Sequence, residues 1–100
     1  MKLGIHLNSD KYRDAAVGLA NAAVKRGDEV TFFIMDAGLH LLNDAAFSGL
    51  SKNEKISMSF CEHSAKSMNF DESNIPAEIK ASSQLNNAIM FNESDKVIVL

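Results

Sequence analysis

Residues 2–35, "KLGIHLNSDKYRDAAVGLANAAVKRGDEVTFFIM", decide the fold, because two apolar segments flank one long helical segment. In the first segment Leu3, Ile5 and Leu7 alternate onto one face, as in a short buried strand. The second, "EVTFFIM" at 29–35, is β-branched and aromatic, which favours a strand. Two strands joined by a helix predict parallel pairing.

The segment between these strands is rich in alanine, which favours a helix from about Lys11 to Arg26. Ser9 or Asp10 can cap its start by accepting a hydrogen bond from a free backbone N–H. Gly27 provides the left-handed residue that commonly ends a helix.

Predicted helices and strands also alternate along the rest of the chain. Further helices are expected at about 36–47, 62–68 and 82–92, and further strands at 56–61 and 96–100. Pro76 suits the first position of a helical turn, and Asn69 suits a left-handed helix end. The buried faces of two helices are expected to comprise Leu39, Leu42, Ala46 and Phe47 in one, and Leu85, Ala88 and Ile89 in the other.

The predicted fold class is α/β, with the order βαβαβαβ in one domain over residues 1–100. We expect three layers, with a mostly parallel four-stranded sheet and helices on both of its faces. A flavodoxin-like strand order of 2-1-3-4 is the expected topology. In that order the first and third strands are neighbours.

Composition excludes several classes of function. The net charge is −3 and no basic stripe is present, which argues against nucleic-acid binding. Apolar runs are far shorter than the roughly 20 residues that span a bilayer. The first ten residues lack the apolar core of a signal peptide, and the single cysteine agrees with a reducing compartment, so we expect a cytoplasmic protein.

Working groups in open parallel sheets lie at the carboxyl ends of the strands. The residues expected to line a crevice there are Asn8, Ser9, Asp36 and Gly38. The loop after the first strand, "NSDKYR", has no glycine-rich phosphate-binding pattern, and Asp10 would repel a phosphate. We therefore expect no nucleotide or flavin cofactor.

Cys61 is the strongest candidate for chemistry, because it follows the third strand and precedes a helix. Free backbone N–H groups at a helix start stabilise a thiolate and lower the pKa of the thiol. His63, Ser64 and Lys66 are candidate supporting residues. The alternative is a buried cysteine that only packs as a small apolar side chain.

The histidines favour no metal centre. Cys61 with His63 and a distant His6 is a weak ligand pattern, because structural zinc requires four ligands at defined spacings. An interior, hydrogen-bonded role is expected for His6 and a surface position for His40.

The chain resembles the DsrE/DsrF-like family of small sulfur-relay proteins, which includes TusD-like subunits. The resemblance covers nearly the whole chain and includes a D-x-G-[LV]-type turn at Asp36, Gly38 and Leu39. It rests on four stretches in order: residues 2–42, "ISMSFCEHSAKSMNF" at 56–70, "NIPAEIKASSQLNN" at 74–87 and "SDKVIVL" at 94–100.

The resemblance implies a cysteine after the third strand that accepts sulfane sulfur as a persulfide and passes it on; by position this is Cys61. It implies no metal or organic cofactor, and at most a sulfurtransferase or sulfur-relay activity. It also implies sulfur-donor and sulfur-acceptor proteins as partners, and assembly into homo-oligomers such as trimers or hexamers, or with sister subunits. Relatives often have arginine and then glycine where this chain has "KSMN"; here the arginine is absent, Lys66 keeps one positive charge nearby, and Asn69 can replace the glycine as a helix cap.

Three hypotheses follow. The first is a sulfur carrier that works through Cys61. The second is a non-catalytic oligomeric subunit or adaptor in which Cys61 only packs. The third is a small-ligand or metal-binding module that uses Cys61, His63 and possibly His6.

Overall fold

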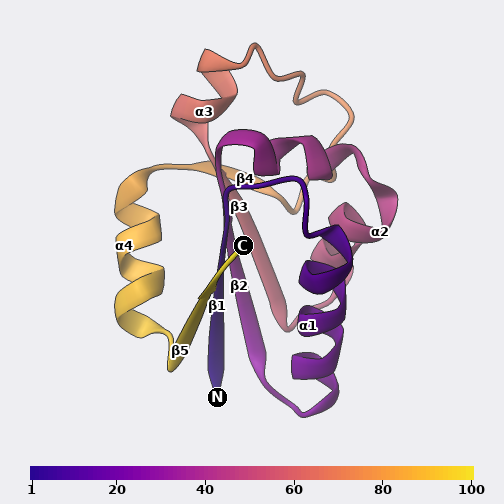
Figure 1. Ribbon diagram of the computed structural model, residues 1–100, viewed down its shortest axis with the longest axis vertical. Coiled ribbons are helices and arrows are strands. Elements are labelled where there is room, and N and C mark those ends of the chain that lie inside the picture. Colours follow the sequence, from indigo (N-terminus) through magenta and orange to yellow (C-terminus); the bar gives the residue numbers. More distant parts are fainter.

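The computed structural model describes residues 1–100 and is built on a five-stranded sheet in which every strand pairing is parallel (Figure 1). This confirms the α/β class and the parallel sheet, but corrects the expected number of strands from four to five. The strands are β1 (Lys2–Leu7), β2 (Glu29–Ile34), β3 (Ile56–Cys61), β4 (Lys80–Ser82) and β5 (Lys96–Val99).

The strand order is β4-β3-β2-β1-β5, so the expected flavodoxin-like order is wrong. β2 lies between β1 and β3, which were expected to be neighbours. The chain steps one way across the sheet from β1 to β4, and then returns to the far edge to form β5. The switch point of the topology therefore lies between β1 and β5, two strands away from the end of β3.

The helical elements differ in length and type. They are α1 (Arg13–Lys25), η1 (Asp36–Asn43), α2 (Ala45–Ser48), η2 (Gly49–Lys52), α3 (Glu62–Ser67) and α4 (Gln84–Glu93), where η denotes a 3₁₀ helix. None of these helices is long and apolar enough to cross a membrane.

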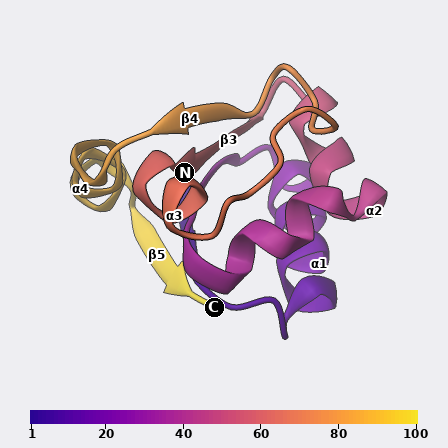
Figure 2. The same ribbon diagram turned by 90° about the horizontal axis from the view of Figure 1, so that it is seen from above.

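The helices cover both faces of the sheet unequally. Figure 2 shows α1 and α2 against one face, α4 alone against the other, and α3 above the strand ends. Right-handed crossovers that move in one direction place their helices on one face, and reversal of direction places the next helix on the other. The return from β4 to β5 thus carries α4 across the face that α1 and α2 leave open.

The main core lies on the face covered by α1 and α2, where one set of alternating strand residues points. Leu3, Ile5 and Leu7 of β1 are buried there beside Phe32 of β2, whose ring lies edge-on to Phe47 of α2 with centroids 5.2 Å apart. Ala16, Ala20 and Ala23 of α1 let that helix lie close to the sheet, and all three are buried.

α1 starts later than the sequence indicated, and neither Ser9 nor Asp10 caps it. Its N-cap is Tyr12, whose side chain makes no capping hydrogen bond. The hydroxyl of Ser9 instead accepts the Lys11 N–H at 3.1 Å and closes a turn before the helix. The end of the helix follows the prediction, since Gly27 has a φ of +90°, in the left-handed region.

The single helix expected at 36–47 is instead a 3₁₀ helix followed by a short α-helix. Asp44 interrupts it with an extended backbone, and its carboxylate accepts the N–H groups of Ala46 and Phe47. This cap starts a new helix and ends the old one. The predicted buried residues Leu39, Leu42 and Phe47 are buried, but Ala46 is exposed.

The two least accurate expectations concern residues 76–93. Pro76 does not begin a helix; its carbonyl accepts the Ile79 N–H in a turn, and β4 follows. In α4 the expected buried residues Leu85, Ala88 and Ile89 are exposed, and Met90 is buried instead. α4 has no helical neighbour on its face of the sheet, so only its inner stripe is covered.

Gly38 explains why η1 crosses so close to the end of β1. A Cβ atom at this position would lie 2.6 Å from the carbonyl oxygen of Leu7 and 3.3 Å from the Ile34 side chain. Gly38 is therefore a packing residue beneath η1, and it does not line a crevice.

We expect Gly38→Ala to lower the free energy of unfolding by roughly 1–3 kcal/mol, because the added methyl group forces backbone to move. Gly18→Ala is the matched control, since nothing lies within 4 Å of its Cβ position on the exposed side of α1. That substitution should stabilise the protein by up to about 1 kcal/mol. Chemical denaturation measures both; equal effects of the two substitutions would contradict the close contact.

Candidate functional site

Cys61 lies at the corner between β3 and α3, as the sequence predicted. Alternation along β3 points Ile56, Met58 and Phe60 into the main core and turns Cys61 to the face covered by α4. There it forms a small apolar cluster with Phe33 of β2 and Met90 of α4. The residue is only 2% exposed. The thiol is therefore enclosed between the sheet and α4.

Hydrogen bonds converge on this buried sulfur. Cys61 is the N-cap of α3, and its Sγ accepts the Ser64 N–H at 3.5 Å. The amide nitrogen of Gln84, the first residue of α4, donates to the same Sγ at 3.8 Å. Burial raises the pKa of the thiol, but hydrogen bonds from Ser64, the His63 N–H and Gln84 outweigh it and leave the pKa below its ordinary value.

Asp36 joins the site through Ser64. Its backbone N–H donates to the Ser64 hydroxyl at 3.1 Å, and that hydroxyl reaches the Asp36 carboxylate at 3.4 Å. Asp36 has a φ of +50°, in the left-handed region that costs free energy for a residue with a side chain. Because β2 and β3 are neighbours, Asp36, two residues after the end of β2, lies beside the first turn after β3.

The other predicted site residues are not brought to the sulfur. The side chains of His63 and Lys66 are exposed on α3, and only the backbone of His63 contributes to the thiol. Asn8 and Ser9 follow β1, and β2 separates that strand from β3. The expected crevice, framed by the loops after the first and third strands, is therefore absent.

Sequence reasoning missed Gln84 and Asn87, which reach the site from α4. Their spacing of three residues places both on one face of the helix, and the Asn87 amide nitrogen donates to Gln84 Oε1 at 3.3 Å. Asn87 Oδ1 in turn lies 3.1 Å from Nδ1 of His6, which confirms the expected hydrogen-bonded histidine. In "SQLNN", at 83–87, the polar residues Gln84 and Asn87 indicated a polar face of the helix, but no sequence pattern linked that face to Cys61.

A polar cleft of about 440 Å³ opens on the sheet beside the cysteine. Thr31, Ser59 and Ser82 contribute hydroxyl groups, Lys80 adds a positive charge, and Asn86 of α4 forms part of the wall. Ser82 is the register partner of Cys61 on β4, so the cleft reaches the strand pair that holds the cysteine. Cys61 itself does not line it.

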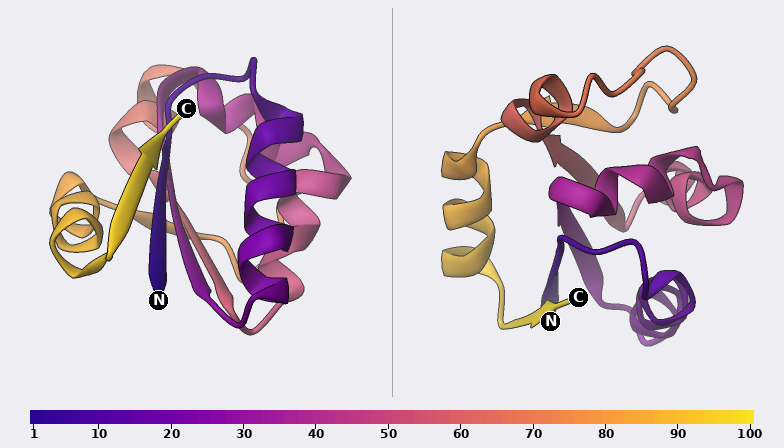
Figure 3. Two further views of the ribbon diagram at one scale, coloured as in Figure 1. Left: turned by 60° about the horizontal axis from the view of Figure 1, so that its bottom comes forward. Right: turned by 45° about the horizontal axis from the view of Figure 1, so that its top comes forward.

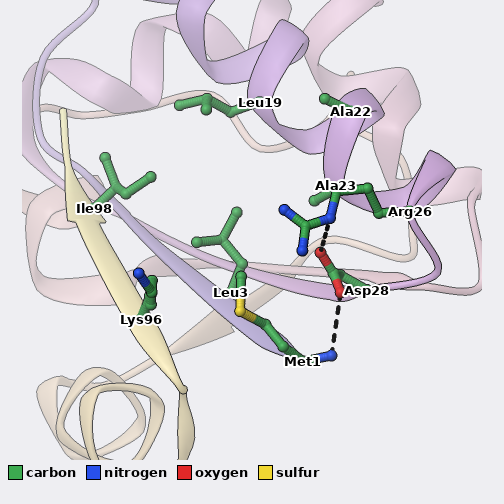
Figure 4. A pocket seen from close by; sticks show the side chains of 9 residues that line it. All are labelled: Met1, Leu3, Leu19, Ala22, Ala23, Arg26, Asp28, Lys96 and Ile98. Carbon is green, nitrogen blue, oxygen red and sulfur yellow. Dashed lines mark hydrogen bonds and ion pairs between the residues drawn. The ribbon is translucent and has the colours of Figure 1, made fainter.

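An apolar hollow of about 370 Å³ lies at the opposite ends of the strands, against α1 (Figure 4). Leu3, Leu19 and Ile98 line it, and Asp28 at its rim bonds the N-terminal amino group at 3.1 Å and the Arg26 guanidinium at 3.6 Å. It lies at the amino ends of β1 and β5, away from Cys61. We therefore assign it no part in the chemistry of the thiol.

The residues of the third hypothesis do not form a ligand set. No group of three or more His, Cys, Asp or Glu side chains in the protein could hold a metal ion. His40 is exposed on η1, and His63 is exposed on α3.

Comparisons with known proteins agree with the fold and with the resemblance seen in the sequence. The profile of the DsrE/DsrF-like family matches residues 1–100. No curated protein sequence matches the chain.

Two solved structures have a similar fold. The ychN protein from E. coli superimposes with a TM-score of 0.81 at 10% identity, over 99% of this chain and 97% of that one. MTH1491 from Methanobacterium thermoautotrophicum, a protein of unknown function, gives a TM-score of 0.70 at 13% identity, over 99% and 98%. At such low identity these similarities concern the fold alone.

We expect Ser64→Ala to raise the pKa of the Cys61 thiol, because the hydroxyl is one of the groups that stabilise the thiolate. The rate of alkylation of the native protein, followed against pH, measures this pKa. Ser67→Ala, at the exposed end of α3, is the control and should leave it unchanged. A Ser64→Ala protein with an unaltered thiol pKa would contradict the assigned role.

The lowered pKa of Cys61 also makes stability depend on pH. The folded protein releases the thiol proton more readily than the unfolded chain, whose cysteine pKa is about 8.5. Its contribution is thus fully present above about pH 8.5 and is lost as pH falls through the folded pKa. The difference in unfolding free energy between the native protein and Cys61→Ser, measured in a reducing buffer, should rise with pH across this window; a flat difference would contradict it.

Proposed function

The chain belongs to the DsrE/DsrF-like family, and on this premise we propose that it is a sulfur-relay protein that carries sulfane sulfur as a persulfide on Cys61. The observation that supports the proposal is the set of hydrogen bonds to Sγ, which favours the thiolate although the residue is buried. A thiolate is the form of cysteine that acts as a nucleophile.

The loading step is a displacement at sulfur. The Cys61 thiolate attacks the outer sulfur of a donor persulfide, R–S–SH, in line with the bond to the inner sulfur. The bond between Sγ and the outer sulfur forms, the donor S–S bond breaks, and R–S⁻ leaves with the electron pair. The products are Cys61–S–SH and the donor thiolate, so no external oxidant or reductant is consumed.

The unloading step reverses these roles. The thiolate of an acceptor protein attacks the outer sulfur of Cys61–S–SH, and Cys61 leaves as a thiolate. The same N–H donors that stabilise the thiolate before loading stabilise the leaving group at this point. Because lower thiol pKa makes a better leaving group, the site suits release as well as attack.

We assign the supporting residues different roles. Ser64 donates its N–H to the sulfur, and its hydroxyl also lowers the pKa of the thiol. His63 and Lys66 have exposed side chains on the same short helix, where they can contact a donor or an acceptor protein. Lys66 adds a positive charge that favours the approach of an anionic persulfide.

The proposal includes association with copies of this chain, as trimers or hexamers, or with sister subunits of the same fold. It is supported by three large apolar side chains that α4 exposes: Leu85 is 68%, Ile89 43% and Phe91 45% exposed. Covering them would remove apolar surface from water. We place the protein in the cytoplasm, where a reducing environment keeps a single thiol free.

The burial of Cys61 favours one second candidate, a non-catalytic subunit of the same fold in which the cysteine only packs. At 2% exposure the sulfur is as enclosed as a core side chain, and Phe33 and Met90 lie against it. A carrier requires α4 or α3 to move and uncover Sγ. A packing residue requires no such motion.

Exposure of the native protein to a small-molecule persulfide donor, followed by intact-mass spectrometry, tests the carrier. We expect a gain of one sulfur atom that a reductant removes and that Cys61→Ser abolishes. Native protein that gains no sulfur, while the unfolded chain does, would establish the packing role. Ser82→Ala, on the neighbouring strand, is a control that should load normally.

A further inference from the structure

We propose that His6, Asn87 and Gln84 form a hydrogen-bond relay that runs from β1 through α4 and ends on the sulfur of Cys61, where it stabilises the negative charge. Gln84 contacts the reacting atom, and Asn87 and His6 act on it as positioning residues. This inference rests on the proposed function of Cys61, which it extends to three residues outside the corner between β3 and α3.

The relay consists of three hydrogen bonds in sequence. His6 Nδ1 lies 3.1 Å from Asn87 Oδ1, Asn87 Nδ2 lies 3.3 Å from Gln84 Oε1, and Gln84 Nε2 lies 3.8 Å from Cys61 Sγ. An amide oxygen can only accept, so His6 carries its proton on Nδ1. Every donor in the relay therefore points toward Cys61.

This common direction gives the relay its electrostatic effect. Each amide that accepts a hydrogen bond at its oxygen becomes a stronger donor at its nitrogen, so hydrogen bonds in a chain strengthen one another. The last donor, Gln84 Nε2, thus presents more positive charge to the sulfur than an isolated amide.

The residues of the relay are held in place by the packing around them. The His6 ring stacks on Phe33 with centroids 6.1 Å apart, and the Phe91 ring lies edge-on to it with centroids 5.8 Å apart. Gln84 Nε2 makes a second contact at 3.6 Å with Met35 Sδ, which fixes the rotation of its amide. The spacing of Gln84 and Asn87 by three residues on α4 aligns their amides.

Other titratable groups near the sulfur act by different routes. Asp36, after β2, faces Ser64 and competes with the thiolate for its hydroxyl proton. His63 and Lys66 on α3 have exposed side chains. Lys80 of β4 lies in register with Ser59, on the sheet face that Cys61 shares. None of these belongs to the relay, so substitutions within it leave them in place.

The test measures the pKa of the Cys61 thiol from the pH dependence of alkylation in four single variants. Gln84→Met removes the last donor and should slow alkylation at neutral pH by about two- to tenfold, the range expected of one hydrogen bond. Like Gln84→Met, the variants Asn87→Leu and His6→Phe should raise the thiol pKa, but by smaller amounts. Asn92→Leu, on the exposed side of α4, is the matched control and should change nothing.

Double variants separate a relay from general loosening of α4. In the Gln84→Met background, Asn87→Leu and His6→Phe should cause no further change, because the relay is already cut next to the sulfur. The proposal would be overturned if Asn87→Leu and His6→Phe still shifted the thiol pKa at full size in this background. It would also be overturned if the single variants at His6 and Asn87 caused no shift of the thiol pKa. If Gln84→Met fails to fold, Gln84→Leu serves in its place, since it also removes the donor and adds no charge beside the sulfur.

The experiment requires no sulfur donor, so the relay and the carrier can fail separately. If the substitutions have non-additive effects on the thiol pKa, but the protein accepts no sulfur, the result would support the relay and refute the carrier. A protein that loads sulfur on Cys61 but shows independent effects at Gln84, Asn87 and His6 would support the carrier and refute the relay.

Discussion

The parallel pairing of β2 with β3 is the constraint on which the site depends. The register that matches Ile34 with Phe60 makes the two strands end at the same level. Asp36 then lies beside the first turn of α3, where it bonds Ser64, and Ser64 in turn bonds Cys61. A shift of register by one residue would turn Cys61 into the main core and Phe60 toward α4. The apolar requirement for Phe60 in the core thus fixes the direction in which the sulfur points.

The return of the chain across the open face completes the site. Figure 3 shows α4 as the only helix on its side of the sheet, with α1 and α2 on the other. α4 buries the sulfur with Met90 and, nearly two turns earlier, supplies the Gln84 donor. α4 therefore has two opposing effects on the thiol pKa, since its burial of the sulfur raises it and its Gln84 hydrogen bond adds to those of α3 that lower it. The balance favours the thiolate, which is the physical basis for proposing a nucleophile at a buried position.

Much of the fold could be predicted from local pattern, and the site only in part. Alternation in "ISMSFC" fixed β3 and the position of Cys61, and the alanines of α1 and the glycine at 27 marked its helix and exit. Three-residue β4 is too short to show a pattern, and without it the position of α4 and the true strand order could not be deduced. His6, Gln84 and Asn87 meet across 81 residues of sequence, and only the tertiary fold brings them together.

The most direct measurement of the central claim is the rate at which native Cys61 reacts with a small alkylating reagent as a function of pH, compared with the same chain in denaturant. We predict a native thiol that titrates below the value of about 8.5 for a free cysteine and reacts more slowly than in the unfolded chain, because the contact with α4 covers the sulfur. A cysteine that is silent in the folded protein at every pH, and reacts only after unfolding, would contradict it and make Cys61 a packing residue.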